Sequence, residues 1–159
     1  MKGTYNKLSI RSIICFGILI LMMLFITMLS NQTGQVSVAL SEKVASGLHI
    51  EYVAGFRHLS TRPLFLGLSL RACAHVLLYA VLGFAVFKTI GYISGLKNHR
   101  ELFTVIICFG FSLFDEFHQM FVPGRDFEIA DLVLDAFGYT VIIIVAWTLQ
   151  LIRKRISVK

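Results

Sequence analysis

Long apolar runs restrict the fold of this chain more than any other feature of its sequence. Four of them, at about 10–29, 72–90, 102–120 and 129–151, come close to the ~20 residues that cross a bilayer as a helix. The third reaches that length only if it continues past Phe114 through Asp115 and Glu116. The sequence therefore predicts an all-α fold, an integral membrane four-helix bundle in a single domain over residues 1–159.

Basic and acidic residues fall on opposite sides of these predicted spans. Ten of the fifteen lysines and arginines precede the first span, lie in or beside the connection between the second and third, or follow the fourth. Eight of the nine acidic residues lie on the other side, and Glu101 is the exception. Because basic residues accumulate in cytoplasmic loops, we expect a multi-pass protein with both termini in the cytoplasm. The net charge of +6 is thus a topology signal, and no nucleic-acid partner is expected.

The cysteines and the first apolar run give no sign of a processed, disulfide-linked protein. Cys15, Cys73 and Cys108 lie inside predicted spans, where thiols behave as small apolar side chains. The first run follows basic residues, as in a signal peptide, but it exceeds the ~7–15 residues of a signal's apolar region. We expect it to be retained as a helix.

The connection between the first two spans is predicted to contain a helix on the outer surface of the membrane. Turn-forming residues 30–34 end the first span, and Ser37 follows as a candidate N-cap. Leu40, Val44 and Leu48 then recur every four residues and form one apolar stripe. Such a stripe favours an external interfacial helix between the first and second spans.

Ionisable residues gather at the ends of three predicted spans that share the external side. Arg71, His75 and Tyr79 are spaced by four residues, as are Asp131 and Asp135, so each set occupies one helix face. Charged groups at membrane depth are expensive and mark functional sites, so we expect these faces to meet in one polar cavity. The candidate polar cluster comprises Arg71, His75, Tyr79, Asp115, Glu116, His118, Gln119, Arg125, Asp131 and Asp135.

This cluster contains more carboxylates than guanidinium groups, which predicts either a protonated carboxyl or a bound cation. His75 and His118 are able to form a zinc site with Asp131 or Asp135, but the two histidines lack the spacing that places a pair on one helical face. We therefore expect no metal and no cofactor. The alternative is a purely structural cluster that holds helices together. In it, one of the adjacent acids Asp115 and Glu116 would face away from the cavity.

These residues resemble the signature of the VanZ-like membrane proteins over nearly the whole chain. The resemblance lies in the segment Ser30-Asn31-Gln32-Thr33-Gly34, in Arg71-x-x-x-His75-x-x-x-Tyr79-x-x-x-Gly83, and in Asp115-Glu116-x-His118-Gln119-x-Phe121-x-Pro123-Gly124-Arg125 followed by Asp131 and Gly138. The chain departs from the pattern at Thr33, where the family usually has proline, and at Ala72, where a second basic residue is common.

The resemblance implies a protein of the bacterial plasma membrane that contributes to low-level resistance to teicoplanin and related lipoglycopeptides. It implies action at the outer face of the membrane, with the lipid bilayer and a lipid-linked envelope precursor or the glycopeptide itself as partners. Two other functions fit the residues: a membrane-embedded enzyme acting on an envelope lipid or lipid-linked glycan, and a non-catalytic membrane assembly partner. The sequence assigns no catalytic residue and is compatible with an oligomer.

Overall fold

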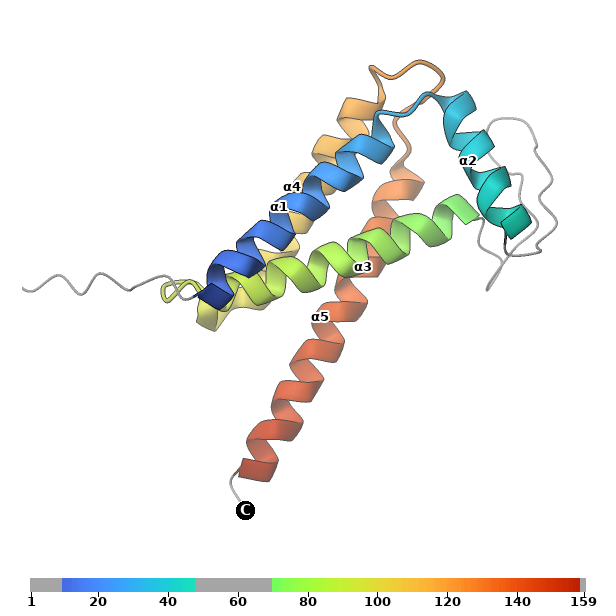
Figure 1. Cartoon of the computed structure of the whole chain (residues 1–159). Coiled ribbons are helices and arrows are strands. Elements are labelled where there is room, and N and C mark those ends of the chain that lie inside the picture. Colours follow the sequence, from blue (N-terminus) through green and yellow to red (C-terminus); the bar gives the residue numbers. More distant parts are fainter. Residues whose placement is uncertain (1–9, 48–69, 158–159) are drawn as a thin grey trace, which may run out of the picture.

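The computed structural model describes residues 10–47 and 70–157, and all the regular secondary structure within them is helical (Figure 1). The helices are α1 (Ile10–Ser30), α2 (Gly34–Gly47), α3 (Leu70–Ile90), α4 (Arg100–Gln119) and α5 (Ile129–Ser157), with a short 3₁₀ helix, η1 (Lys97–His99), before α4. The predicted all-α class is confirmed. The helices that correspond to the four predicted spans begin and end close to the expected positions, except that α5 continues to Ser157, past the predicted end at about 151.

Three helices in the described part of the chain are long and apolar enough to cross a membrane. These are α1 over Ile10–Ser30, α3 over Arg71–Ile90, and α5 over Ile129–Arg153. α4 has 20 residues, but charged residues stand in both its first and last turns. α4 is long enough to cross a bilayer, but it carries more charged residues than the other three helices do over their spans. A fourth membrane crossing therefore stays a prediction.

α3 is the central helix, and its most extensive contact is with α5. Two glycines allow this contact. An added Cβ at Gly138 of α5 would lie 2.4 Å from the backbone oxygen of Val76, and one at Gly83 of α3 would lie 2.7 Å from the Cβ of Tyr139. Small residues let membrane helices approach this closely. The buried apolar residues Leu82, Val86 and Ile26 form the core beside this contact.

Much of the apolar surface of α1 and α5 has no protein partner among the described residues. Leu21 of α1 is 67% exposed and Ile156 of α5 is 70% exposed. The C-terminal half of α5 extends away from the other helices (Figure 1). Apolar side chains exposed over whole helices are explained by contact with membrane lipid.

α2 begins earlier than the sequence indicated. The backbone N–H of Ser37 donates to the carbonyl of Thr33, so Ser37 lies inside the first turn and is not the N-cap. The Thr33 hydroxyl instead accepts a long contact from the Val36 N–H at 3.5 Å. Leu48, the last member of the predicted apolar stripe, lies outside the described residues, and the interfacial position of α2 stays a prediction.

Two turns pack together at one end of the molecule, where α1 ends and α3 and α5 begin; we call it the pocket end. The N–H of Gly34 donates to the carbonyl of Pro123 at 3.2 Å. Gly124 has a φ of +76°, which a type II turn requires at its third residue and glycine adopts without strain. The Arg125 N–H closes this turn on the carbonyl of Val122 at 3.1 Å. Pro123 and Gly124 therefore form a tight turn, and its contact with Gly34 fixes the start of α2 against the α4–α5 connection.

Candidate functional site

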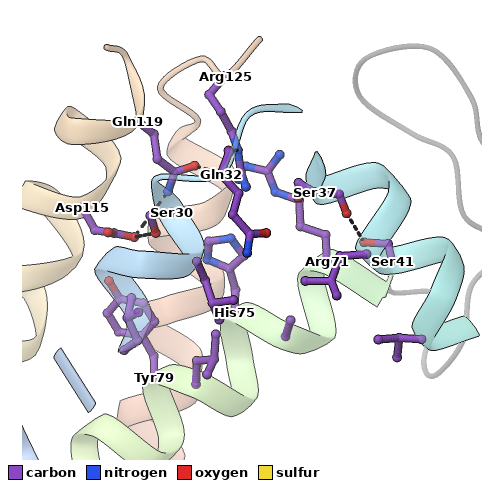
Figure 2. Close-up of a pocket in the computed structure, with 16 residues that line it drawn as sticks. Ser30, Gln32, Ser37, Ser41, Arg71, His75, Tyr79, Asp115, Gln119 and Arg125 are labelled. Atoms are coloured by element: carbon purple, nitrogen blue, oxygen red, sulfur yellow. Dashed lines mark hydrogen bonds between the residues drawn. The ribbon is translucent and has the colours of Figure 1, made fainter. Parts of the chain in front are cut away.

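A cavity of about 200 Å³ lies at the pocket end, between α1, α2, α3 and α4 (Figure 2). One part of its lining is apolar and comes mainly from Ile26, Leu29, Leu40, Val44 and Leu78. The other part carries polar side chains: Ser30, Gln32, Ser37, Ser41, Arg71, His75, Tyr79, Asp115, Gln119 and Arg125. Six residues of the predicted polar cluster thus line one cavity. The two acids of α5, Asp131 and Asp135, do not line it but pair with Arg71 and His75, which do.

One ion pair and one histidine–carboxylate hydrogen bond join α3 to α5 beneath the cavity. A terminal nitrogen of Arg71 donates to Oδ2 of Asp131 at 2.5 Å, and Nδ1 of His75 lies 2.8 Å from Oδ1 of Asp135. The spacing of four residues on both helices places the pairs one turn apart, in the same order along each helix. The second oxygen of Asp135 accepts the hydroxyl of Ser112, from α4, at 2.6 Å.

The polar residues at the end of α4 form a second group, linked to α1. Asp115 and Glu116 are both buried, although they are adjacent in sequence. Asp115 accepts the Ser30 hydroxyl at 2.7 Å, and Glu116 accepts the backbone N–H of Glu128 at 3.0 Å. Gln119 donates to both carboxylates. Asp115 lines the cavity and Glu116 does not, so only one of the two adjacent acids faces it, although both are buried and hydrogen-bonded.

Arg125 spans the rim of the cavity. Its Nε donates to the carbonyl of Gln32 at 3.2 Å, and a terminal nitrogen donates to Oε1 of Gln119 at 3.1 Å. Burial lowers the pKa of the Arg125 guanidinium, with a further contribution from the positive charge of Arg71. An arginine nevertheless keeps its proton in proteins, so Arg125 supplies a fixed positive charge above the buried acids.

The remaining two predicted residues differ in where they lie. Tyr79 is 1% exposed and lines the cavity on the α3 side, where its ring lies 6.3 Å from that of Phe111. His118 stacks on Phe114 at a ring separation of 6.4 Å and does not line the cavity. The structure therefore does not bring His118 together with His75.

Sequence reasoning missed two serines and one backbone group at this site. Ser30 was interpreted only as a turn former, yet it holds Asp115. Ser112 was placed one turn inward from Asp115 and left out of the cluster, although its spacing of three and four residues from Asp115 and Glu116 puts it on the same helix face. The N–H of Glu128, in the connection between α4 and α5, carries no sequence signal at all.

The arrangement offers two kinds of chemistry. His75 is oriented by a carboxylate, which is the geometry of a positioned acid or base. His75, Glu116 and Asp131 each also present one ligand atom, and these three atoms lie within 4.8 Å of one another, close enough for a single metal ion to reach all three.

Buried charge pairs, a half-apolar cavity and lipid-facing helices together define a helical membrane protein with a polar site built into its helix ends. Comparison with known families gives this class a name: a family model described as VanZ/LLP1 matches residues 15–152. The chain therefore belongs to the VanZ/LLP1 family, as its motifs indicated. No curated protein and no solved structure matches the chain significantly.

Proposed function

We propose that this protein lowers the susceptibility of a bacterium to teicoplanin and related lipoglycopeptides by binding an amphiphilic envelope molecule in the cavity at the pocket end. The observation that carries the proposal is the divided lining of that cavity. Apolar side chains of α1, α2 and α3 suit a lipid chain, whereas Arg71, His75 and Arg125 suit the polar groups of a lipid-linked precursor or of the drug.

The distribution of charge supports placing this end at the outer face of the plasma membrane. Lys88, Arg100 and the basic C-terminal end of α5 belong to the helix ends remote from the cavity. The positive-inside rule assigns such ends to the cytoplasm. A ligand in the cavity would then lie level with the outer leaflet, where lipid-anchored glycopeptides and their targets meet.

Filling the cavity tests this function. Ser41→Trp places an indole in it from α2, and we expect the change to return teicoplanin susceptibility to that of cells without the protein. Ser46→Trp is the matched control, because Ser46 is also on α2 and makes the same kind of bond to its own backbone, but lies outside the cavity. The measurement is the teicoplanin minimum inhibitory concentration in a susceptible host, with each variant at equal abundance in the membrane.

The two tryptophan variants are read against the unchanged protein. We expect that protein to raise the inhibitory concentration several-fold, and Ser46→Trp to do the same. No increase with the unchanged protein would reject the resistance function. Full resistance with Ser41→Trp at equal abundance would reject the cavity as its site.

A second candidate function, a membrane-embedded enzyme acting on an envelope lipid or lipid-linked glycan, is favoured by the His75–Asp135 pair. Asp135 accepts a hydrogen bond from Nδ1 of His75 and another from the hydroxyl of Ser112, so the imidazole ring is fixed in place. Nε2 of His75 is then the nitrogen that can act as an acid or base. The enzyme and the binding protein make different predictions for Asp135→Asn, which are argued in the Discussion.

A further inference from the structure

We propose that His75, Glu116 and Asp131 form a binding site for a divalent metal ion of the zinc class. The three residues come from α3, α4 and α5, and their ligand atoms lie within 4.8 Å of one another. A zinc ion with bonds of about 2 Å would hold such atoms roughly 3.4 Å apart, which small side-chain rotations achieve. This inference does not depend on the proposed function, because metal binding is a property of the purified protein.

The histidine is already held in the form that a metal requires. Nδ1 of His75 lies 2.8 Å from Oδ1 of Asp135, and a carboxylate in that position accepts a hydrogen bond from Nδ1–H, which keeps the ring proton on Nδ1. Nε2 then carries a lone pair, and it lies 3.5 Å from Oδ2 of Asp131. Histidine ligands of metal sites are oriented by carboxylates in this way, and these outer partners raise metal affinity.

The two carboxylate ligands are positioned by partners of their own. Each oxygen of Glu116 accepts one hydrogen bond, from the side chain of Gln119 and from the N–H of Glu128, both at 3.0 Å. Asp131 is held by Arg71. A carboxylate oxygen has two lone pairs, so each group keeps one for a metal after these bonds are made.

The balance of charge favours a dication at this position. Within the described residues, the buried side chains include four carboxylates, on α4 and α5. Arg71 bonds to Asp131, and Arg125 bonds to Gln119, which itself donates to Asp115 and Glu116. With His75 neutral and the four carboxylates ionised, the two guanidinium groups leave an excess of two negative charges in a region of low dielectric constant, where unpaired charge is costly. One divalent cation would remove that excess.

The donor set indicates the kind of ion. A nitrogen ligand beside two carboxylates suits zinc and neighbouring transition metals, whereas calcium and magnesium prefer sites made of oxygen atoms. Three protein ligands also leave a coordination position free, as in catalytic zinc sites.

Metal binding to the purified full-length protein, without a histidine tag and stripped with a chelator, tests the site. We expect one zinc ion per chain by elemental analysis after dialysis, and Glu116→Gln to weaken zinc binding at least about tenfold by competition with a chelating dye. His118→Gln is the matched control, since it lies two residues away on α4, outside the group of three, and should bind zinc as the unchanged protein does.

Asp131→Asn serves the same purpose as Glu116→Gln if that variant does not purify as a single species. Cobalt binding to the unchanged protein gives an independent readout, because cobalt in a four-coordinate protein site absorbs visible light much more strongly than six-coordinate cobalt in water. Absence of stoichiometric zinc and of a cobalt spectrum in the unchanged protein would overturn the proposal. So would zinc binding by Glu116→Gln or Asp131→Asn equal to that of the unchanged protein, or an equal loss in His118→Gln. Resistance measured in cells has no bearing on these outcomes.

Discussion

Gly138→Ala is expected to prevent stable packing of α5 on α3. The added Cβ would lie 2.4 Å from the backbone oxygen of Val76 and 3.1 Å from the backbone nitrogen of Ala80. Neither atom belongs to a side chain that can rotate away, so the two helices must move apart along their whole contact. Overpacking of this kind costs about 1–3 kcal/mol or more, against about 1 kcal/mol that alanine gains over glycine within a helix.

The matched control is Gly110→Ala. Gly110 also lies inside a helix, α4, but an added Cβ there meets no atom within 4 Å. We expect this variant to be at least as stable as the unchanged protein, and Gly138→Ala to lower both membrane abundance and the thermal midpoint of the detergent-solubilised protein. Equal midpoints for the two variants would contradict the close approach of α5 to α3.

The helices themselves were predictable because the bilayer imposes their length. An apolar run that must pair every backbone group internally has to be helical, and its ends are marked by polar residues. For this reason the run at about 72–90 matches α3, Leu70–Ile90, closely. The start of α2 was missed because Thr33 and Ser37 are both capable N-caps, and the choice depends on the contact of Gly34 with the distant turn at Pro123.

The site was only partly predictable, for a related reason. Spacing by four residues showed that His75 follows Arg71 on one face and that Asp135 follows Asp131 on another. Which acid pairs with which base depends on how α3 and α5 are shifted relative to each other along their axes. That shift is set by the close contact of Gly138 with the backbone of Val76. The position of His118 outside the cluster was not predictable either. Successive residues of a helix point about 100° apart, so the direction of His118 relative to the cavity follows only when the buried face of α4 is known.

Asp135→Asn is expected to abolish the resistance phenotype while leaving a folded protein. Asp135 is 1% exposed, and its two oxygens accept from His75 and Ser112. Asparagine has nearly the same volume, but it offers one acceptor and one donor, so it cannot accept both bonds. The negative charge of Asp135 that orients the His75 ring is lost. The ring proton is then no longer kept on Nδ1, so Nε2 is no longer kept free to accept a hydrogen bond or bind a ligand. The substitution therefore changes the chemistry of the site far more than its packing.

Asp126→Asn is the matched control, because Asp126 is an exposed acid in the nearby α4–α5 connection. Both variants are compared with the unchanged protein for teicoplanin inhibitory concentration, membrane abundance, thermal midpoint, and the lipid and envelope-glycan composition of the cells. Asp126→Asn should match the unchanged protein in all of them. Full resistance with Asp135→Asn would exclude the His75–Asp135 pair from function.

The way in which resistance is lost separates the three functions. An enzyme loses its product, so an envelope lipid or glycan changes in amount between the unchanged protein and Asp135→Asn at equal abundance. A binding protein loses resistance with no change in these molecules, and its thermal midpoint falls only by the small amount that one lost buried hydrogen bond causes. A non-catalytic assembly partner loses resistance only in proportion to a lower midpoint or abundance, because in that case the pair serves solely to join α3 to α5. Since Asp135→Asn preserves volume and loses one buried hydrogen bond, a complete loss of resistance in a protein that stays folded and equally abundant means that the charge on Asp135 acts on His75 and, through it, on whatever the cavity holds.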